Sequence, residues 1–394
     1  MIMNQMLQYK PEELEKLKGY ITAKEIIQQP RLWKETYDII NKNKENIKSF
    51  LNKVLANKQL RIILTGAGSS AFVGECVAPF LSKKLEKTVE AIPTTDIVSN
   101  PKNYLYKDIP TLLISYARSG NSPESVGTVD LAENLIKDLY QVVVTCNPNG
   151  KLAQKSSSDD KKLLISMPKD SNDRGFAMTG SFTTMVLASL LLFDTDNLDS
   201  IESHINNLVS NGEKILKEEI ERLKEISLNN FNRAVYLGSS SLKGLARESA
   251  LKMVELTRGK ITTSYDSPLG FRHGPKSILN DNTLVVVYLS NDKYTRGYEI
   301  DLLKEMSKEK NDTKVVAISH YLDKKVEDLV DYTICINEDK IKIIDDTYLI
   351  FNYILTAQIF SFYKSIELGI SPDDPSPDGI VNRVVKGVTI YPYK

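Results

Sequence analysis

Short apolar segments alternate with segments of helical periodicity along most of the chain. Five apolar runs in the first half begin at Arg61, Thr88, Thr111, Gln141 and Leu163. Five more in the second half begin at Ala234, Ile261, Thr283, Lys314 and Tyr332. Near-continuous apolar strands separated by helices are typical of parallel sheets that are covered on both faces. The pattern therefore predicts an α/β protein with two doubly wound, flavodoxin-like domains.

The two halves of the chain also resemble each other. The stretch "RIILTGAGSS" starts at Arg61 and "RAVYLGSSSL" starts at Arg233, and both read as a strand, a glycine, serines and a helix. Their separation is longer than the repeat of a solenoid protein, so two copies of one domain are the simplest explanation.

Outside the two domains the pattern is helical. We expect a helical N-terminal extension over residues 1–55, a first domain over 56–196, a polar helical linker over 197–230, a second domain over 231–370 and a tail over 371–394. Thr22 and Glu25 have the spacing of a capping box at a helix start. The apolar stretch from Tyr348 is interrupted by polar residues and is too short to span a bilayer, so we expect a buried helix that ends near Gly369.

Composition narrows the class of partner. The chain has 51 basic and 51 acidic side chains, so its charge favours a small molecule over a nucleic acid. No apolar segment follows a basic start at the N-terminus, and no membrane association is expected. The three cysteines, Cys76, Cys146 and Cys335, are far apart and are interpreted as buried thiols of a reducing compartment. These features predict a cytoplasmic protein.

A serine-rich turn follows the third apolar run. In "SYARSGNSPES", residues 115–125, Ser119, Ser122 and Ser125 offer hydroxyl donors, and Gly120 allows close approach of a ligand to the backbone. Ligands of open parallel sheets bind beyond the carboxyl ends of the strands, where helix N-termini favour anions. The turn therefore indicates phosphate binding, although serines that merely cap a helix would give the same pattern. Neither a dinucleotide fingerprint nor a P-loop is present.

A second informative stretch begins at residue 246. On a helix, Glu248, Lys252 and Glu255 lie on one face, which is either a solvated face with salt bridges or an acid–base group. His273 follows on a Gly-Pro turn in "FRHGP", a position that favours a functional role. The other histidines, His204 and His320, are interpreted as uninvolved.

Together these motifs resemble a known family. The serine turn, "ESALKMVE", "FRHGP" and the tail sequence "VVKGVTI" are similar to those of tandem sugar-isomerase (SIS) domain proteins. The chain most closely resembles the galactosamine-6-phosphate deaminase/isomerase branch, also called tagatose-6-phosphate ketose/aldose isomerase. It is also similar to the isomerase half of glucosamine-6-phosphate synthase. Its sequence starts with Met1-Ile2 rather than with the cysteine nucleophile of that enzyme, so we do not expect amide transfer from glutamine.

The resemblance implies a phosphate site and an acid–base site. Ser70, Ser119 and Ser122 would hold the substrate phosphate, with Arg118 beside them and Gly120 in the same turn.

The acid–base site would draw on five side chains. Glu255 would move the proton between C2 and C1, Glu248 and Lys252 would position and polarise substrate oxygens, His273 would assist ring opening and Lys386 would close over the site. The resemblance also implies a homodimer with shared active sites, in which the histidine comes from the neighbouring subunit.

The expected reaction is conversion of galactosamine 6-phosphate to tagatose 6-phosphate and ammonia. Such chemistry needs one carboxylate of suitable pKa and no metal or other cofactor. Alternatives are a hexose-phosphate aldose–ketose isomerase, a glucosamine-6-phosphate deaminase and, in another class, a sugar-phosphate-sensing binding protein. Sensors of this kind usually carry a basic helix-turn-helix, which the first 55 residues do not show.

Overall fold

A computed structural model describes residues 5–156, 159–309, 312–321, 323–337, 343–385 and 387–393. The chain forms two compact units, each built around one parallel sheet. The first-sheet unit comprises the described residues within 31–174, 178–205 and 378–394. The second-sheet unit comprises those within 1–30, 175–177 and 206–377. Lys386, the residue predicted to close over the site, lies outside the described residues.

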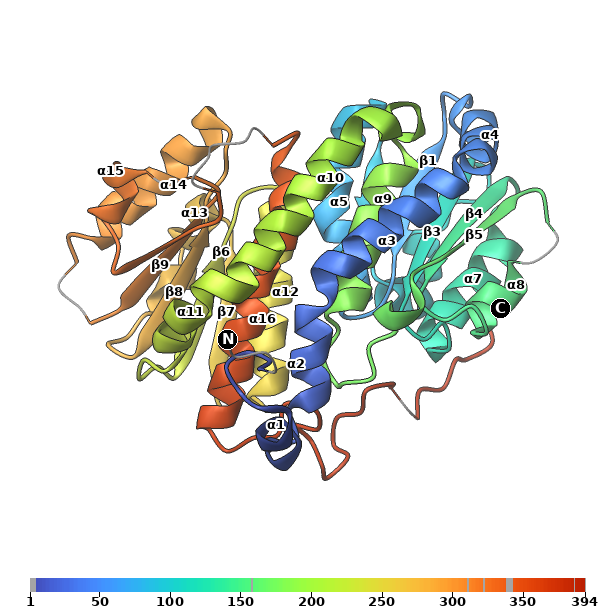
Figure 1. Cartoon of the computed structure of the whole chain (residues 1–394). Helices are drawn as coiled ribbons and strands as arrows, with labels where there is room; N and C mark the ends of the chain where they lie inside the picture. The colour runs from blue at the N-terminus through green and yellow to red at the C-terminus, as the bar shows by residue number, and fades with distance from the viewer. Residues whose placement is uncertain are drawn as a thin grey trace. The chain divides into compact units, whose positions relative to one another are not determined.

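The first sheet has the strand order β2-β1-β3-β4-β5, and all its pairings are parallel. Its strands are β1 (Arg61–Thr65), β2 (Val89–Ala91), β3 (Thr111–Ala117), β4 (Leu139–Thr145) and β5 (Lys162–Ser166). The helices that connect and cover them are α5 (Ser69–Leu85), α6 (Thr94–Ser99), α7 (Pro123–Leu135), α8 (Lys151–Lys155) and α9 (Gly180–Leu192). Helices lie on both faces of this sheet (Figure 1).

The second sheet repeats this topology in the order β10-β9-β8-β6-β7, again with parallel pairing throughout. Its strands are β6 (Arg233–Leu237), β7 (Thr262–Asp266), β8 (Thr283–Tyr288), β9 (Lys314–Ser319) and β10 (Tyr332–Cys335). Its helices are α12 (Ser241–Leu256), α13 (Pro268–Phe271), α14 (Lys293–Met306), α15 (Lys324–Glu327) and α16 (Leu349–Glu367).

The predicted fold class is confirmed, since each of the ten apolar runs forms a strand. Strands β1, β3 and β8 are buried along their whole length, which explains their near-continuous apolar sequences. The edge strands β2 and β7 are only partly buried, and β7 accordingly has a polar sequence, TTSYD.

The N-terminal segment forms four helices, and they divide between the two units. They are α1 (Pro11–Leu17), α2 (Tyr20–Ile27), α3 (Gln29–Lys42) and α4 (Lys44–Leu55). The predicted capping box is wrong, because α2 already begins at Tyr20 with Gly19 as its N-cap. Thr22 instead donates its hydroxyl to Asp373 (2.7 Å), and Glu25 accepts a hydrogen bond from the amide of Gly175 (3.2 Å). Both residues therefore attach distant segments to α2.

The segment between the two sheets is helical, as predicted, and consists of α10 (Leu198–Lys214), a π-helical turn (Ile215–Glu219) and α11 (Ile220–Ser227). It is amphipathic rather than polar, because Leu198, Ile201, Ile205 and Leu208 are buried at helical spacing. Short 3-10 helices complete the described structure at Pro101–Asn103, Lys169–Ser171, Thr195–Asn197, Pro275–Ile278 and Asp346–Tyr348.

The apolar segment from Tyr348 forms the buried helix α16, as predicted, and Gly369 follows its end with φ +70°. Among the described residues, no helix combines the length and the apolar character that crossing a bilayer requires. Two of the predicted buried thiols, Cys76 and Cys146, are buried, but Cys335 is only half-buried. Burial raises the pKa of Cys146 to about 12, so its thiol is protonated and unreactive at neutral pH.

Candidate active site

The predicted phosphate-binding residues lie at one edge of the first sheet. Strands β1 and β3 are parallel neighbours, with Thr65 paired to Ser115, so the turns that follow them meet at the same edge. Ser70 lies in the first turn of α5, and Ser122 is the N-cap of α7. Two helix N-termini therefore begin beside each other at the carboxyl ends of these strands.

The serine turn is held in one conformation by the loop after β4. Gly120 has φ +66°, which a residue with a side chain rarely adopts. The side-chain amide of Asn147 donates to the carbonyl of Ser119 (2.8 Å). A Cβ on Gly150 would lie 2.6 Å from the same carbonyl oxygen, so only glycine permits this close approach. The turn is thus preorganised without any ligand.

Hydroxyl groups and one guanidinium surround this turn. Ser122 donates its hydroxyl to Ser125 (2.7 Å), and Ser70 is buried. Arg118 is 8% exposed and donates to the backbone carbonyl of Arg383 in the C-terminal tail (2.6 Å). The tail therefore attaches directly beside the predicted phosphate site.

The tail is fixed by an arginine that the sequence reading missed. Arg383 donates through Nε to the carbonyl of Asp173 (3.0 Å). Asp173 is fully buried, and its carboxylate accepts hydrogen bonds from the amides of Thr179 (2.8 Å) and Ser181 (2.9 Å) at the start of α9. An aspartate followed by serines and threonines indicates a helix start in the sequence. The sequence does not indicate that the backbone of this aspartate also anchors the C-terminal tail.

The predicted acid–base residues meet on α12 in the second-sheet unit. The ammonium of Lys252 lies 3.3 Å from a carboxylate oxygen of Glu248 and 2.5 Å from one of Glu255. The side chains of Glu248 and Lys252 are fully buried, whereas that of Glu255 is 23% exposed. The alternative of a solvated face is therefore wrong, and Glu255 is the carboxylate of this group that a ligand can reach.

Electrostatics keeps the central lysine charged. Burial alone lowers the pKa of Lys252, but attraction to Glu248 and Glu255, reinforced by hydrogen bonds, outweighs this and raises the pKa above its ordinary value. A buried ammonium between two carboxylates is a fixed positive charge, suited to orienting one carboxylate and to stabilising nearby negative charge.

His273 lies on an exposed loop of the same unit, between α13 and the 3-10 helix Pro275–Ile278. Gly274 beside it has φ +118°, which only glycine adopts readily. Arg272 and Lys276 flank the histidine, and both form ion pairs with Glu305 on α14, at 2.6 Å and 2.5 Å. Sequence reasoning missed Glu305, which holds both sides of the loop.

The two histidines interpreted as uninvolved lie elsewhere. His204 is half-buried on α10, and His320 is buried after β9.

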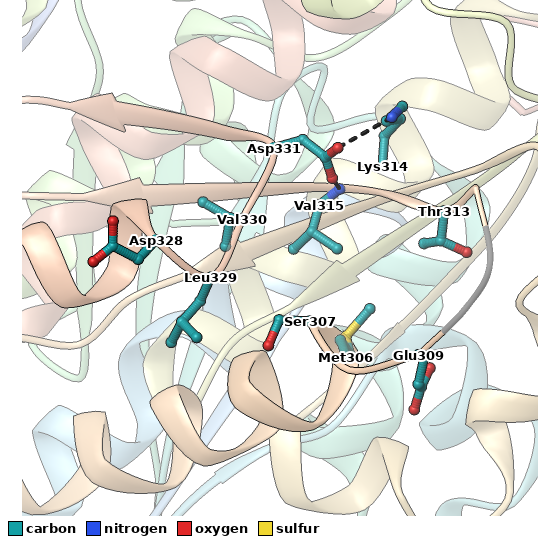
Figure 2. A pocket seen from close by; sticks show the side chains of 10 residues that line it. All are labelled: Met306, Ser307, Glu309, Thr313, Lys314, Val315, Asp328, Leu329, Val330 and Asp331. Carbon is teal, nitrogen blue, oxygen red and sulfur yellow. Dashed lines mark hydrogen bonds and ion pairs between the residues drawn. The ribbon is translucent and has the colours of Figure 1, made fainter.

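A shallow pocket of about 280 Å³ in the second-sheet unit lies far from the edge that binds ligands in such sheets. Figure 2 shows Lys314 and Val315 at the start of β9 and Asp331 just before β10. Asp331 pairs with Lys314 (3.1 Å) and accepts from the amide of Val315 (2.9 Å), so these polar groups satisfy each other (Figure 2). Because the pocket is at the amino ends of the strands, it is not a candidate for the active site.

Comparison with known proteins finds one family domain at each sheet. The family model for the SIS domain matches residues 54–194 and 227–365, which contain the first and second sheets. The chain belongs to the SIS domain family. The predicted resemblance to tandem SIS proteins is thereby confirmed.

Relatives of this SIS protein cover nearly its whole length. It is 42% identical to the D-galactosamine-6-phosphate deaminase AgaS of Shewanella sp. (strain ANA-3) over 97% of this chain and 94% of that one. A solved structure from Clostridium novyi NT is 53% identical with a TM-score of 0.97, covering 99% of this chain and 100% of that one. The tagatose-6-phosphate ketose/aldose isomerase of Escherichia coli is 39% identical with a TM-score of 0.88, covering 95% and 97%.

Proposed function

We propose that this chain catalyses the deaminating isomerisation of an amino-sugar phosphate: galactosamine 6-phosphate and water give tagatose 6-phosphate and ammonia. The observation that carries the proposal is the group formed by Glu248, Lys252 and Glu255, with one accessible carboxylate on a buried ammonium. The AgaS relative is similar over nearly its full length and is named for this deamination.

The serine turn binds the substrate phosphate in this proposal. The first turn of α7 offers backbone amides, and Ser119, Ser122 and Ser70 offer hydroxyls, while Arg118 supplies a positive charge. Gly120 lets the phosphate approach the backbone. Because the phosphate is remote from C1 and C2, its binding energy orients the sugar without taking part in the chemistry.

Glu255 transfers the proton. In the open-chain amino aldose, Glu255 removes the proton at C2, which is acidified by the C1 aldehyde, and delivers a proton to C1. In the same step the aldehyde oxygen gains a proton and the amine nitrogen loses one, so that C1 becomes a hydroxymethyl group and the C2–N bond becomes an imine. Water then adds at C2 and expels ammonia, leaving the C2 ketone. Each step moves only protons, water and ammonia, so no metal or other cofactor takes part.

Lys252 and Glu248 act through Glu255. Since both are fully buried, we assign them to positioning: the ammonium orients the carboxylate of Glu255, and Glu248 holds the ammonium in place through its ion pair. The predicted contact of these two side chains with substrate oxygens is replaced in this proposal by that indirect role.

His273 and Lys386 complete the proposal from the family resemblance. We propose a homodimer in which the exposed His273 loop of one subunit assists ring opening at the active site of the other, while Lys386 closes over the bound sugar.

We also propose the domain boundaries that the sequence predicts for the extension, the two domains, the linker and the tail. The absence of any disulfide among the described cysteines fits a cytoplasmic location.

One alternative has support of its own. The Escherichia coli relative is named a ketose/aldose isomerase, and isomerisation of a hydroxy-sugar phosphate uses the same proton transfer without loss of ammonia. A gluco rather than galacto configuration of the substrate would alter only contacts at C4.

A substrate panel separates these activities. The purified protein is incubated with galactosamine 6-phosphate, glucosamine 6-phosphate, galactose 6-phosphate and unphosphorylated galactosamine, and both ammonia and ketose are measured. The proposal expects ammonia and tagatose 6-phosphate in equal amounts from the first sugar, and neither from galactosamine. Ketose from galactose 6-phosphate with no ammonia from either amino-sugar phosphate would establish the plain isomerase instead.

A further inference from the structure

The second sheet contains counterparts of the two turns that form the proposed phosphate site of the first. Both sheets have one strand order, so β6 corresponds to β1 and β8 to β3. In the register of each sheet, Arg61 pairs with Thr111 and Arg233 pairs with Thr283. The turns after β6 and β8 are therefore the counterparts of the turns after β1 and β3.

The turns after β1 and β6 have the same backbone conformation. Gly68, the N-cap of α5, has φ 58° and ψ −132°, and Ser240, the N-cap of α12, has φ 52° and ψ −123°. The preceding glycines match as well, because a Cβ on Gly66 would lie 2.6 Å from the backbone of Ser70 and one on Gly238 would lie 2.3 Å from that of Leu242. Ser240 adopts this conformation although its side chain disfavours it, which indicates that the turn geometry itself is required.

A carboxyl group joins the two turns of the second sheet. Glu299 on α14 is fully buried; one carboxylate oxygen accepts from the hydroxyl of Ser239 after β6 (2.7 Å) and the other from the amide of Ser290 after β8 (2.8 Å). Asp346 accepts two further hydrogen bonds from the second turn, from the hydroxyl of Ser290 and from the amide of Asn291 (2.9 Å). Two carboxylates of the chain itself thus bind these four donors.

At the position in the first sheet that corresponds to Glu299, the chain has an apolar residue. Glu299 lies seven residues after Asp292, the N-cap of α14, and the residue seven positions after Ser122, the N-cap of α7, is Val129. Val129 is buried in the apolar core. In the serine turn, the amide of Asn121 donates to the hydroxyl of Ser119 (3.3 Å), and the hydroxyl of Ser122 donates to that of Ser125.

We propose that Glu299 is a built-in ligand of the second SIS domain, a carboxyl group that fills the anion-binding turns which the first domain offers to substrate phosphate. The analogy between the Glu299 carboxyl group and a substrate phosphate rests on the proposed function. The hydrogen bonds between Glu299 and the two turns do not depend on it. The site accepts a small carboxylate when Glu299 is shortened. Because Ser239 directly precedes Ser240, the N-cap of α12, Glu299 also fixes the start of the helix that carries Glu255, as a positioning residue.

Rescue by formate tests the proposal. In Glu299→Ala, about 50 mM formate at about pH 8 raises the midpoint of thermal unfolding by roughly 2–4 °C over chloride of equal ionic strength. Wild type and Glu299→Gln, whose side chains still fill the site, give no such difference. A formate effect that is equal in all three proteins, or absent from Glu299→Ala, overturns the proposal.

Turnover provides the second readout. Glu299→Ala lowers kcat more than it changes KM. Formate raises kcat again over the same concentration range in which it raises the unfolding midpoint. If formate stabilises the variant but wild type shows no turnover of amino-sugar phosphates, the proposed function fails while the built-in ligand stands. If formate stabilises the variant without restoring kcat, the positioning of α12 is refuted.

A milder variant serves if Glu299→Ala does not fold. Ser239→Ala removes one donor from the Glu299 carboxylate, so the pKa of Glu299, followed by carbon NMR of the carboxyl group, rises above its wild-type value. Ser200→Ala, an exposed serine on α10, is the control. An unchanged pKa in Ser239→Ala overturns the proposal.

Discussion

Lys252 is the residue on which the charge balance of α12 depends. Its ammonium lies between the carboxylates of Glu248 and Glu255, and both its own side chain and that of Glu248 are fully buried. Removing one partner of a buried ion pair leaves an uncompensated charge, whereas replacing both costs much less. The three charges are therefore expected to be strongly coupled.

Lys252→Met should lower the free energy of unfolding by about 3–5 kcal/mol. The double variant Glu248→Gln/Lys252→Met should recover a substantial part of that loss, since the buried carboxylate is then neutral too. Urea unfolding of wild type, both single variants and the double variant measures the coupling. Additive effects of the two substitutions would show that the buried pair is not a unit.

Glu299 should make stability depend on pH. Burial raises its pKa from 4.5 to about 7, and the nearby charge of Asp346 adds to this, while hydrogen bonds from Ser290 and Ser239 and the charge of Arg296 oppose it. Tyr353 of α16 also faces this group. Because the folded state holds the proton more tightly than the unfolded chain, the stability contributed by Glu299 is complete below about pH 4.5 and is lost as the pH rises through about 7.

Glu299→Gln removes this dependence, because an amide does not titrate. Relative to wild type, the Gln variant should gain up to about 3 kcal/mol of unfolding free energy between about pH 4.5 and pH 8. Urea unfolding at several pH values measures the difference. A constant difference across that range would mean that Glu299 does not titrate as its burial implies.

Ion pairs hold the loop that carries His273. Arg272 and Lys276 on either side of the histidine both bind Glu305, whose carboxylate is 40% exposed. Hydrogen bonds from Lys276 and Arg272 lower the pKa of Glu305, so the clamp is fully charged at neutral pH. Pairs as exposed as these contribute little to global stability.

Glu305→Gln should therefore loosen the loop without unfolding the protein. We expect tryptic cleavage after Arg272 to become several-fold faster, while the unfolding free energy changes by less than about 1 kcal/mol. Glu309→Gln is the matched control, because Glu309 binds Lys276 but not Arg272. Equal cleavage rates in wild type and Glu305→Gln would contradict the clamp.

The elements themselves were readable from the sequence where one physical effect dominates. Strands that are buried along their whole length, such as β1, β3 and β8, are apolar at nearly every position and are therefore predictable. Helix α16 is predictable because polar residues interrupt its apolar segment and Gly369 follows its end. The capping-box spacing of Thr22 and Glu25 does not predict their contacts, because their partners, Asp373 and Gly175, are distant in the sequence. Helical spacing placed Glu248, Lys252 and Glu255 on one face, but what covers that face depends on tertiary packing.

The sequence also does not predict the roles of Glu299 and Glu305, because these roles depend on tertiary contacts. Each acts through contacts with turns from other parts of the chain, and neither has a motif around it.

The proposed dimer predicts that each active site contains residues from both subunits. If Glu255 and His273 of one active site belong to different subunits, a mixture of inactive Glu255→Gln chains and inactive His273→Ala chains forms heterodimers with one intact site. Random exchange makes half of the dimers mixed, so about a quarter of wild-type activity should return. Exchange is verified with differently tagged chains, and exchange without recovered activity would place both residues in the same chain or His273 outside the site.

The central claim is that Glu255 moves the proton in a deamination, and ammonia release from galactosamine 6-phosphate by wild type and Glu255→Gln tests it most directly. Wild type should release one ammonia per tagatose 6-phosphate formed. Glu255→Gln keeps the shape of the side chain but cannot accept the proton, so kcat should fall by about 10²–10⁴ while substrate affinity changes little. No ammonia from wild type, or ammonia from Glu255→Gln at the wild-type rate, would contradict the account.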